Sequence, residues 1–382
     1  MKNIRIGTHQ PQPAGFKAFI PDPYPPQGLL ELPAALIKKS SQATMPVGKL
    51  DGITRRLPNA DFFLLMYLKK DAASSSQIEG TVATMVDAIE AEVQASTNLP
   101  ADVDDILHYL KALHYGMDRI EKDEFPLSLR LVKELHYQLL HQARASHFSN
   151  PGEFRSSQNW IGGTLPGNAR FVPPPPAELP IALGDLEQFM HADDAIPPIL
   201  KAGMIHAQFE VIHPFLDGNG RTGRMLITIY LWHEGCLEKP VLFLSSYFKE
   251  HQQVYYDRLG GYHQGKAFEW LDFYLDGVIA ISQEAILMAD QITALREKDM
   301  TLVQGLGKRS AESAIRILTR LFAQPIVNVK TIQDWTNFTR DGAYKTIARL
   351  VDLGILVPKD IDIKYGQSYI YKDYIKIFAD YK

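Results

Sequence analysis

The chain has 382 residues, a length that indicates two or three domains. Hydrophobic residues make up 46% of it and charged residues 22%, so it can build sizeable cores and does not have the composition of a disordered chain. Cys236 is the single cysteine, which excludes a disulfide framework or a thiolate metal site and fits a reducing compartment. We find no signal-like leader and no apolar run of about 18 residues, and so expect a soluble, cytoplasmic protein with no membrane partner.

Charge is distributed unevenly along the chain. The formal net charge is −4. Residues 308–382 contain 13 Lys or Arg against 8 Asp or Glu, whereas the preceding residues contain 27 against 36. The overall charge therefore gives no hint of nucleic-acid binding, but the tail is a basic module on an acidic body.

The spacing of apolar residues predicts a mainly α-helical body. Residues 11–33 contain many prolines and are expected to form an extended arm that lies on the rest of the protein. From about residue 59 apolar residues recur at intervals of three and four, which is typical of helices. The expected helices span 60–80, 81–96, 102–121, 128–146, 177–192, 196–211, 221–235, 245–259 and 266–299.

Two segments interrupt this helical pattern. Residues 159–180 contain the turn signals Gly162-Gly163 and Pro166-Gly167 between short apolar pieces, which predicts a small β-hairpin or flap that leaves through a proline run. After residue 306 a helix, a helix-turn-helix and an alternating segment around Tyr365-Gly366 follow in order. This order predicts a C-terminal winged helix-turn-helix.

The segment "HPFLDGNGRTGR", residues 213–224, contains the parts of a phosphate site. Gly218, Asn219 and Gly220 tolerate positive φ, so successive backbone amides can face one anion. A helix expected to begin near Arg221 adds free N–H groups and the positive end of its dipole. Arg221 and Arg224, three residues apart, can bind phosphate oxygens in a bidentate manner.

The same segment offers a base and a metal ligand. A carboxylate beside a polyphosphate is repelled unless a cation lies between them, and Mg²⁺ is often held by one or two carboxylates plus phosphates, which assigns Asp217 to Mg²⁺. The ordinary pKa of histidine, about 6.5, makes His213 a usable general base. Together these residues predict transfer of a phosphate-containing group from a nucleotide to a hydroxyl.

The segment resembles the signature of the Fic-domain family, H-P-F-x-D/E-G-N-G-R/K-x-x-R, at every fixed position. Three further stretches resemble the family: "SSQIEG" at 75–80 is similar to its inhibitory motif S/T-x-x-x-E-G/N, and "GEFR" at 152–155 and "YFKEHQQVYYDRL" at 247–259 also fit. The likeness covers roughly residues 10–300, and a winged helix is a common appendage in such proteins. It implies three segments: an arm and helices with the inhibitory motif at 1–100, a Fic catalytic core at 101–300 and a winged helix domain at 301–382.

The resemblance implies a helical fold, a flap, and transfer of AMP from ATP to a Ser, Thr or Tyr hydroxyl of a protein, which can be the enzyme itself. His213 would deprotonate that hydroxyl and Asp217 would bind Mg²⁺, while Arg224 would pair with the β/γ-phosphates. The remaining implied positions fall into three groups. These are the phosphate loop, with Arg221 as its support; the flap that aligns the target by strand pairing; and the surroundings of the adenine base of ATP. They are Gly218, Asn219, Gly220 and Arg221; Trp160, Ile161, Gly162 and Gly163; and His251, Tyr255 and Tyr256.

The inhibitory motif predicts self-inhibition. Ser75 and Glu79 are spaced i,i+4 and therefore share a helix face, and Gly80 ends the turn without bulk, which allows close approach. If Glu79 reaches Arg224, it occupies the arginine and repels the γ-phosphate. ATP would then bind with its α-phosphate out of line for attack.

Other functions stay open at this stage. Related sites move other phosphate-containing groups or remove AMP from targets. The tail presents Arg340, Lys345 and Arg349, so a nucleotide-sensing regulator that binds DNA through the winged helix is an alternative, as is a tail that binds a protein partner. A homodimer is a further open alternative.

Overall fold

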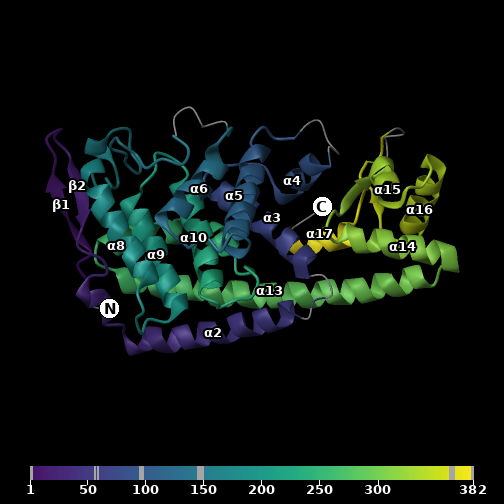
Figure 1. Cartoon of the computed structure of the whole chain (residues 1–382), viewed down its shortest axis with the longest axis horizontal. Helices are drawn as coiled ribbons and strands as arrows, with labels where there is room; N and C mark the ends of the chain where they lie inside the picture. The colour runs from purple at the N-terminus through teal and green to yellow at the C-terminus, as the bar shows by residue number, and fades with distance from the viewer. Residues whose placement is uncertain are drawn as a thin grey trace.

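The structure is a computed structural model that describes residues 3–55, 57, 60–93, 99–143, 150–360 and 366–379. Figure 1 shows an elongated, mainly helical molecule in which one long helix, α13 (Ala267–Gln304), runs from the body to the C-terminal tail. The mainly α prediction is therefore confirmed. Helix α13 also crosses the domain boundary predicted at residue 301 without a break.

The N-terminal arm contains more regular structure than the sequence predicts. Strands β1 (Gly7–Pro11) and β2 (Lys17–Pro21) form an antiparallel hairpin with Gly7 opposite Pro21, and α1 (Gln27–Leu30) and α2 (Ala34–Thr54) follow. The spacing of apolar residues does not predict helix α2, because its buried face includes Ser40, Ala43 and Thr54, which are small or polar. It packs along α13, so tertiary contact rather than a strong apolar stripe stabilises it (Figure 1).

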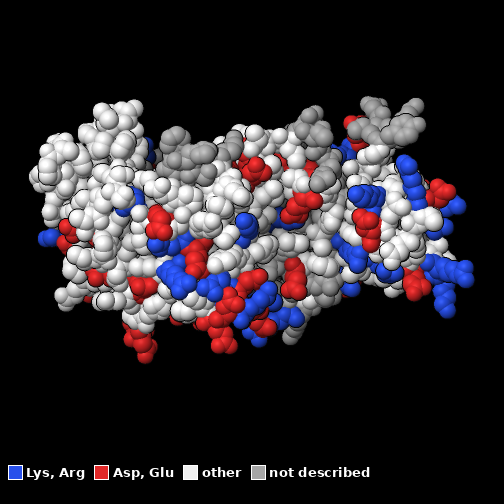
Figure 2. Space-filling view, turned by 45° about the horizontal axis from the view of Figure 1, so that its top comes forward, with Lys and Arg blue, Asp and Glu red and all other residues white. Residues whose placement is uncertain are grey.

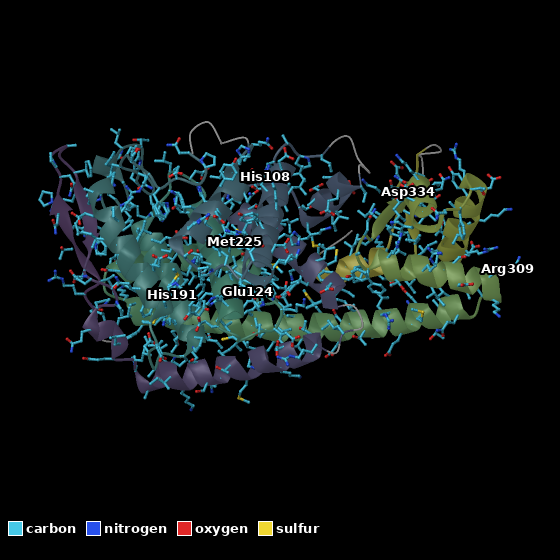
Figure 3. All side chains as sticks on the ribbon, in the orientation of Figure 1. His108, Glu124, His191, Met225, Arg309 and Asp334 are labelled. Carbon is cyan, nitrogen blue, oxygen red and sulfur yellow. The ribbon has the colours of Figure 1, made fainter. Side chains whose placement is uncertain are left out.

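The helices of the body lie close to the expected ranges. Two of them, α9 and α10, are buried on nearly every side, as expected for helices at the centre of a helical domain. Met225 of α10 is fully buried, and Figure 3 shows it within the body. The body helices are α3 (Ala60–Ile78), α4 (Met85–Glu92), α5 (Val103–Glu121), α6 (Leu129–Leu140), α8 (Leu179–His191), α9 (Pro198–Ile212), α10 (Asn219–His233), α11 (Ser245–Glu250) and α12 (Gln252–His263), with 3₁₀ turns η1 (Pro166–Asn168) and η2 (Pro176–Glu178).

Helix α13 is the most apolar long helix of the described chain. An 18-residue window in it has a mean hydropathy of 1.3, enough by length and composition to cross a membrane. However, 44% of that window is buried, and the helix packs against α2, α9, α12, α14 and α17. These contacts are those of a core helix.

The tail has the elements expected of a winged helix. Its sheet is antiparallel in the order β3-β5-β4, and residues 361–365, which include Tyr365 of the predicted hairpin turn, lie outside the described residues. Lys and Arg side chains gather at this end of the molecule in Figure 2. The elements are α14 (Lys308–Leu321), β3 (Ile326–Asn328), α15 (Val329–Thr336), α16 (Arg340–Asp352), β4 (Val357–Pro358), β5 (Ser368–Ile370) and α17 (Lys372–Phe378).

The tail contacts the body through polar and apolar side chains. The Tyr371 hydroxyl donates to an Asp299 carboxylate oxygen of α13 at 2.6 Å, and Lys359 Nζ lies 2.6 Å from Glu90 Oε2 of α4. Glu90 is only 8% exposed, so this ion pair is largely shielded from solvent. Helix α17 also packs on α3, the helix that leads into the predicted inhibitory motif.

Candidate active site

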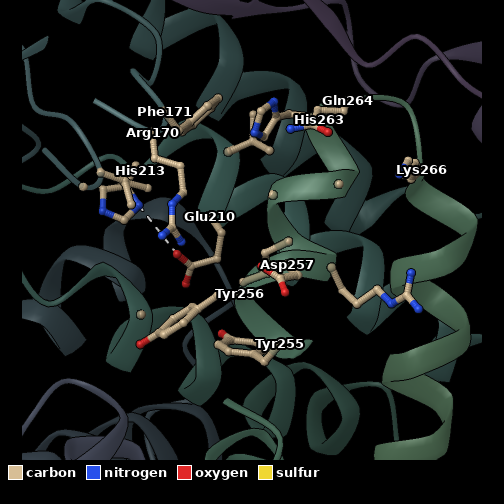
Figure 4. A pocket seen from close by; sticks show the side chains of 18 of the residues that line it. Arg170, Phe171, Glu210, His213, Tyr255, Tyr256, Asp257, His263, Gln264 and Lys266 are labelled. Atoms are coloured by element: carbon tan, nitrogen blue, oxygen red, sulfur yellow. Dashed lines mark ion pairs between the residues drawn. The ribbon is translucent and has the colours of Figure 1, made fainter. Parts of the chain in front are cut away.

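One cavity of about 740 Å³ brings much of the predicted site together. Its walls come from the end of α9, the start of α10, the end of α3, the flap and α12. Figure 4 shows side chains of α9, the flap and α12 around this space. His213, Gly220 and Arg224 of the signature line it, and so does Glu79 of the inhibitory motif. Residues 145 positions apart therefore meet at one site.

His213 ends α9 in a left-handed conformation, with φ 49° and ψ 61°. This conformation is unfavourable for a residue with a side chain, so the surroundings must stabilise it. Arg155 Nε donates to the His213 carbonyl at 2.9 Å, and Asn159 Nδ2 donates to the same oxygen at 3.2 Å. Arg155 is almost fully buried, and burial lowers its pKa to about 10. The "GEFR" stretch thus supplies a support for the backbone of the expected base.

The loop after His213 is braced from within. Asn219 Oδ1 accepts from the Phe215 amide and Asn219 Nδ2 donates to the Phe215 carbonyl, both at 2.8 Å. Gly218 adopts φ 73°, and Thr222 N donates to its carbonyl, so α10 begins two residues earlier than predicted. The Asn219 side chain therefore shapes the loop, while the backbone amides at the start of α10 provide the anion site.

His136, which the sequence left unassigned, lies beneath this loop. Its Nδ1 accepts from the Gly152 amide at 2.8 Å, so its Nε2 carries the proton that is donated to the Asp217 carbonyl at 2.9 Å. The ring stacks on Phe215 with centroids 3.7 Å apart. Burial lowers the pKa of His136 to about 4, so it is neutral at physiological pH.

Asp217 is the carboxylate of the loop. Its side chain is 49% exposed, its Oδ1 accepts from the Gly218 amide at 2.6 Å, and its Oδ2 lies 3.9 Å from Arg221 Nη2. Among the described residues no cluster of three or more His, Cys, Asp or Glu side chains could hold a metal by itself. A single accessible carboxylate beside a phosphate cradle fits Mg²⁺, which takes the rest of its ligands from phosphates and water.

Arg224 is occupied by the inhibitory motif. It is 4% exposed; its Nε donates to Ser75 Oγ at 2.9 Å, and its Nη2 donates to the Ser75 carbonyl at 2.9 Å and to Glu79 Oε1 at 2.6 Å. Burial by itself lowers the pKa of Arg224, but the Glu79 carboxylate together with Tyr255 and Tyr109 outweighs burial and the pKa is raised. Arg224 is thus permanently charged, and its fork is turned toward α3.

The Glu79 carboxylate also covers the start of α10. A Cβ atom placed on Gly220 would lie 2.3 Å from Glu79 Oε1, so a larger residue there would require this carboxylate to move away from the helix N-terminus. The carboxylate therefore lies where the exposed amides of α10 would attract a phosphate.

Glycine is needed at position 80 for a different physical reason than the predicted one. A Cβ on Gly80 would meet nothing within 4 Å, so close approach does not require glycine there; its φ of +100° does. The end of α3 is fastened from α12 instead. Tyr256 Oη and Gln252 Nε2 donate to the Ile78 carbonyl at 3.0 and 2.9 Å.

The flap is smaller than a full hairpin. Ile161 and Phe171 form one isolated antiparallel bridge, with the Ile161 amide donating to Phe171 at 2.8 Å. Trp160, Ile161 and Gly162 line the cavity, whereas Gly163 (φ 77°) shapes the turn. The arm supports the flap, because the Phe19 amide of β2 donates to the Val172 carbonyl at 2.9 Å.

The three residues expected near the nucleotide base do not all lie at the cavity. Tyr255 and Tyr256 line the cavity, with Tyr255 almost fully buried and its hydroxyl 2.9 Å from His206 Nε2. His251 does not line the cavity; its Nδ1 lies 3.1 Å from the Tyr247 carbonyl, and its ring packs at a tilt against Tyr247. His251 caps the junction between α11 and α12, so proximity in sequence to the tyrosines does not place it at the site.

Sequence reasoning missed four side chains that the structure places at the site. Asn159, Arg155 and His136 reach the loop through backbone carbonyls, and an interaction with a carbonyl leaves no signal in a single sequence. Glu210 had a signal, because it precedes His213 by three residues on a helix and so shares its face.

The fold and the site define a helical domain built to bind a polyanion beside a histidine. Two family models match the chain: "Fic/DOC family" over residues 126–231 and "Fic/DOC family N-terminal" over residues 37–118. The chain belongs to the Fic/DOC family. The predicted core boundary at residue 101 lies within the range of the N-terminal model.

Known proteins agree with this membership. The chain is 32% identical over 159 residues to a protein adenylyltransferase Fic of Aedes aegypti, which covers 41% of the chain and 28% of that relative. It is 28% identical over 175 residues to a probable protein adenylyltransferase of Aquifex aeolicus, covering 46% of the chain and 51% of the relative. The chain thus spans less than a third of the insect relative and about half of the bacterial one.

Solved structures show the same fold. A Fic family protein from Desulfovibrio desulfuricans aligns with a TM-score of 0.55 at 17% identity, over 89% of this chain and 96% of that one. A Fic domain containing signaling protein from Bacteroides thetaiotaomicron aligns with a TM-score of 0.52 at 20% identity, over 64% of this chain and 97% of that one.

Proposed function

We propose that this protein is an autoinhibited protein adenylyltransferase that moves AMP from ATP to a Ser, Thr or Tyr hydroxyl of a protein. One observation carries the proposal: His213, the start of α10 and Arg224 line one cavity, and Glu79 occupies both the arginine and the helix N-terminus. The names of the curated relatives support this class of reaction.

The phosphates of ATP would bind at the start of α10. Gly218, Asn219 and Gly220 supply backbone amides there, Arg224 supplies a charge for the β/γ end, and Arg221 stabilises the loop. Asp217 would hold Mg²⁺, which when bound neutralises charge on the phosphates. The base and ribose would extend toward Tyr255 and Tyr256, which line the same cavity.

His213 would carry the proton transfer. Its imidazole accepts the proton of the target hydroxyl as that oxygen forms a bond to the α-phosphorus, while the bond from the α-phosphorus to the bridging oxygen breaks. Pyrophosphate leaves with the electron pair. The cradle and the histidine lie on separate elements, so removal of His213 should block transfer and spare ATP binding.

Glu79 would inhibit by competing with the nucleotide. Its carboxylate lies 2.6 Å from Arg224 and against Gly220, so a γ-phosphate meets both an occupied arginine and a like charge. ATP then binds out of line, and the enzyme is active only when Glu79 is displaced. The Glu79 side chain is 38% exposed, which leaves a route for its displacement.

The decisive experiment uses ATP labelled at the α-phosphate with the wild type, Glu79→Gly and Glu79→Gly/His213→Ala, both alone and in cell lysate. The expected result is weak labelling by the wild type, strong labelling by Glu79→Gly and none by the double variant. Mass spectrometry of the product should show one added adenylyl group on a hydroxyl side chain. A different added mass, or release of AMP from a modified protein, would assign another reaction to the site.

A second function is favoured for the tail by exposed basic side chains on one helix. Arg340, Lys345 and Arg349 of α16 are all exposed, on the helix that would be the recognition helix of a winged helix domain. Double-stranded DNA is the partner that this helix fits best, although Asp341 and Asp352 reduce its charge. Fluorescence anisotropy with duplex DNA should show salt-sensitive binding that the triple alanine variant loses. Binding unchanged in that variant, or absent at low salt, would exclude this role.

A further inference from the structure

Glu210 is a buried carboxylate that faces the expected base. It lies three residues before His213 on the last turn of α9, and its Oε2 is 3.5 Å from His213 Nδ1. Its side chain is 12% exposed, and both residues line the cavity (Figure 4). The distance is longer than an ordinary charge-assisted hydrogen bond, so the contact is mainly electrostatic.

Neither partner is satisfied elsewhere among the described residues. Glu210 Oε1 and His213 Nδ1 are both buried without another hydrogen bond. Glu210 is also confined by α10, because a Cβ on Gly223 would lie 2.7 Å from its Oε1. A buried carboxylate is costly unless it is paired, so its position against the imidazole needs an explanation.

The surroundings keep Glu210 ionised. Burial alone raises the pKa of its carboxyl, but the interactions with His213, His206 and Arg224 together outweigh burial, and the pKa is lowered. Burial lowers the pKa of His206 and raises that of Tyr255, so both neighbours are neutral near pH 7. The charged and titratable groups that face Glu210 or share its wall of the cavity are His206, His213, Arg224, Tyr255, Tyr256 and Arg170.

We propose that Glu210 is a positioning residue that sets the tautomer of His213 and stabilises its protonated form during transfer. This inference rests on the proposed function and adds a residue to it. A carboxylate beside Nδ1 favours the tautomer with the proton on Nδ1, which leaves the Nε2 lone pair free to accept the proton of the target hydroxyl. As the oxygen–phosphorus bond forms and pyrophosphate leaves, His213 becomes an imidazolium with its positive charge beside the carboxylate.

The test compares Glu210→Gln, which preserves shape but removes the charge, with Glu187→Gln as a matched control. Glu187 of α8 lies outside the cavity lining and accepts from the Leu129 amide at 2.7 Å through an oxygen that glutamine retains. Nitrogen NMR of ring-labelled histidine, with the His213 signal assigned by its loss in His213→Asn, reports the tautomer without any need for turnover. Glu210→Gln should reduce the Nδ1–H tautomer of His213.

Activity in a Glu79→Gly background gives the second readout. Glu210→Gln should lower kcat about 10- to 100-fold, leave the KM for ATP within about twofold, and move the acid limb of the pH profile to lower pH. Glu187→Gln should change none of these quantities.

The two readouts separate the possible failures. An unchanged tautomer of His213 would overturn the inference, whether or not the protein transfers AMP. An altered tautomer with an unchanged kcat and pH profile would overturn the role of Glu210 in the reaction. If Glu79→Gly transfers nothing while the NMR change appears, the proposed function fails and the Glu210–His213 coupling stands.

Discussion

Two segments meet at Arg224, and they are restrained in different ways. The loop after His213 is fixed by buried side chains from distant parts of the chain: Arg155 and Asn159 bind the His213 carbonyl, and His136 binds the Asp217 carbonyl. The end of α3 around Glu79 is held by local turn bonds, by Tyr256 and Gln252 at the Ile78 carbonyl and by Arg224 at Ser75. Glu79 itself is held by one partly exposed ion pair.

This difference suits the two proposed roles: the loop after His213 keeps its geometry, and Glu79 can be displaced. A general base and a phosphate cradle must keep their geometry through every turnover, which explains buried support for a strained residue. The proposed inhibitor must leave, and the Glu79 carboxylate, which is 38% exposed and precedes a glycine with positive φ, is suited to move. Variants that alter the loop after His213 should therefore lower activity, whereas variants that remove Glu79 should raise it.

The largest effect is expected from His213→Ala in the Glu79→Gly background. Removing the base should lower the rate of transfer by about 10²- to 10⁴-fold, because proton removal from the hydroxyl loses its acceptor. ATP affinity, measured by calorimetry, should change less than about threefold. A variant with near-normal transfer would remove His213 as the base.

The next largest expected effect is an increase in the rate of transfer. Glu79→Gly should raise the rate of labelling at least about tenfold, which requires only about 1.4 kcal/mol of inhibition. The measurement is the initial rate at saturating ATP, and Glu79→Gln is the matched variant, since it retains size and loses only the charge. Equal rates in the wild type and in Glu79→Gly would contradict autoinhibition.

The support of the loop is tested by Asn159→Ala. The variant loses the hydrogen bonds to the His213 and Phe215 carbonyls, at 3.2 and 2.8 Å. We expect kcat to fall roughly tenfold because the base is less well positioned, with a loss of about 1–3 kcal/mol in unfolding free energy. Asn168→Ala is a control, because that side chain only closes the exposed flap turn. An Asn159→Ala protein with unchanged kcat would show that the loop needs no such support.

The pH dependence of stability follows from His136. Its pKa is about 4 in the folded protein and about 6.5 in an unfolded chain, so the unfolded state binds a proton first as the pH falls. The unfolding free energy should therefore decrease from about pH 6.5 down to about pH 4, with a contribution near 1.4 kcal/mol per pH unit from this residue. Urea unfolding at several pH values should show a shallower slope for His136→Asn, and an equal slope would contradict the assignment.

The smallest effect is expected from Ser75→Ala. It removes the hydroxyl that accepts from Arg224 Nε at 2.9 Å but leaves the Ser75 carbonyl and Glu79 in place. Loosening the arginine in this way should raise basal labelling roughly two- to fivefold, well below the rise from Glu79→Gly. A decrease would show that Ser75 orients Arg224 for the nucleotide rather than away from it.

Much of the fold could be predicted, because helices such as α5 and α6 have clear apolar faces. The hairpin β1–β2 and helix α2 could not be predicted. The hairpin lies beside and within a proline-rich stretch that indicates only an extended arm, and α2 buries small and polar residues against α13. The sequence also did not separate His251 from Tyr255 and Tyr256: the tyrosines line the cavity, while the His251 ring packs against Tyr247.

The sequence by itself determined the chemistry of the loop: a histidine, a carboxylate, residues that accept positive φ and two arginines stand at spacings that suit a phosphate site. Those are local properties of a short segment. The tertiary structure alone decided which groups face them. Contact between Glu79 and Arg224 depends on how α3 packs against α10, and the support from Arg155, Asn159 and His136 depends on backbone carbonyls that carry no residue identity.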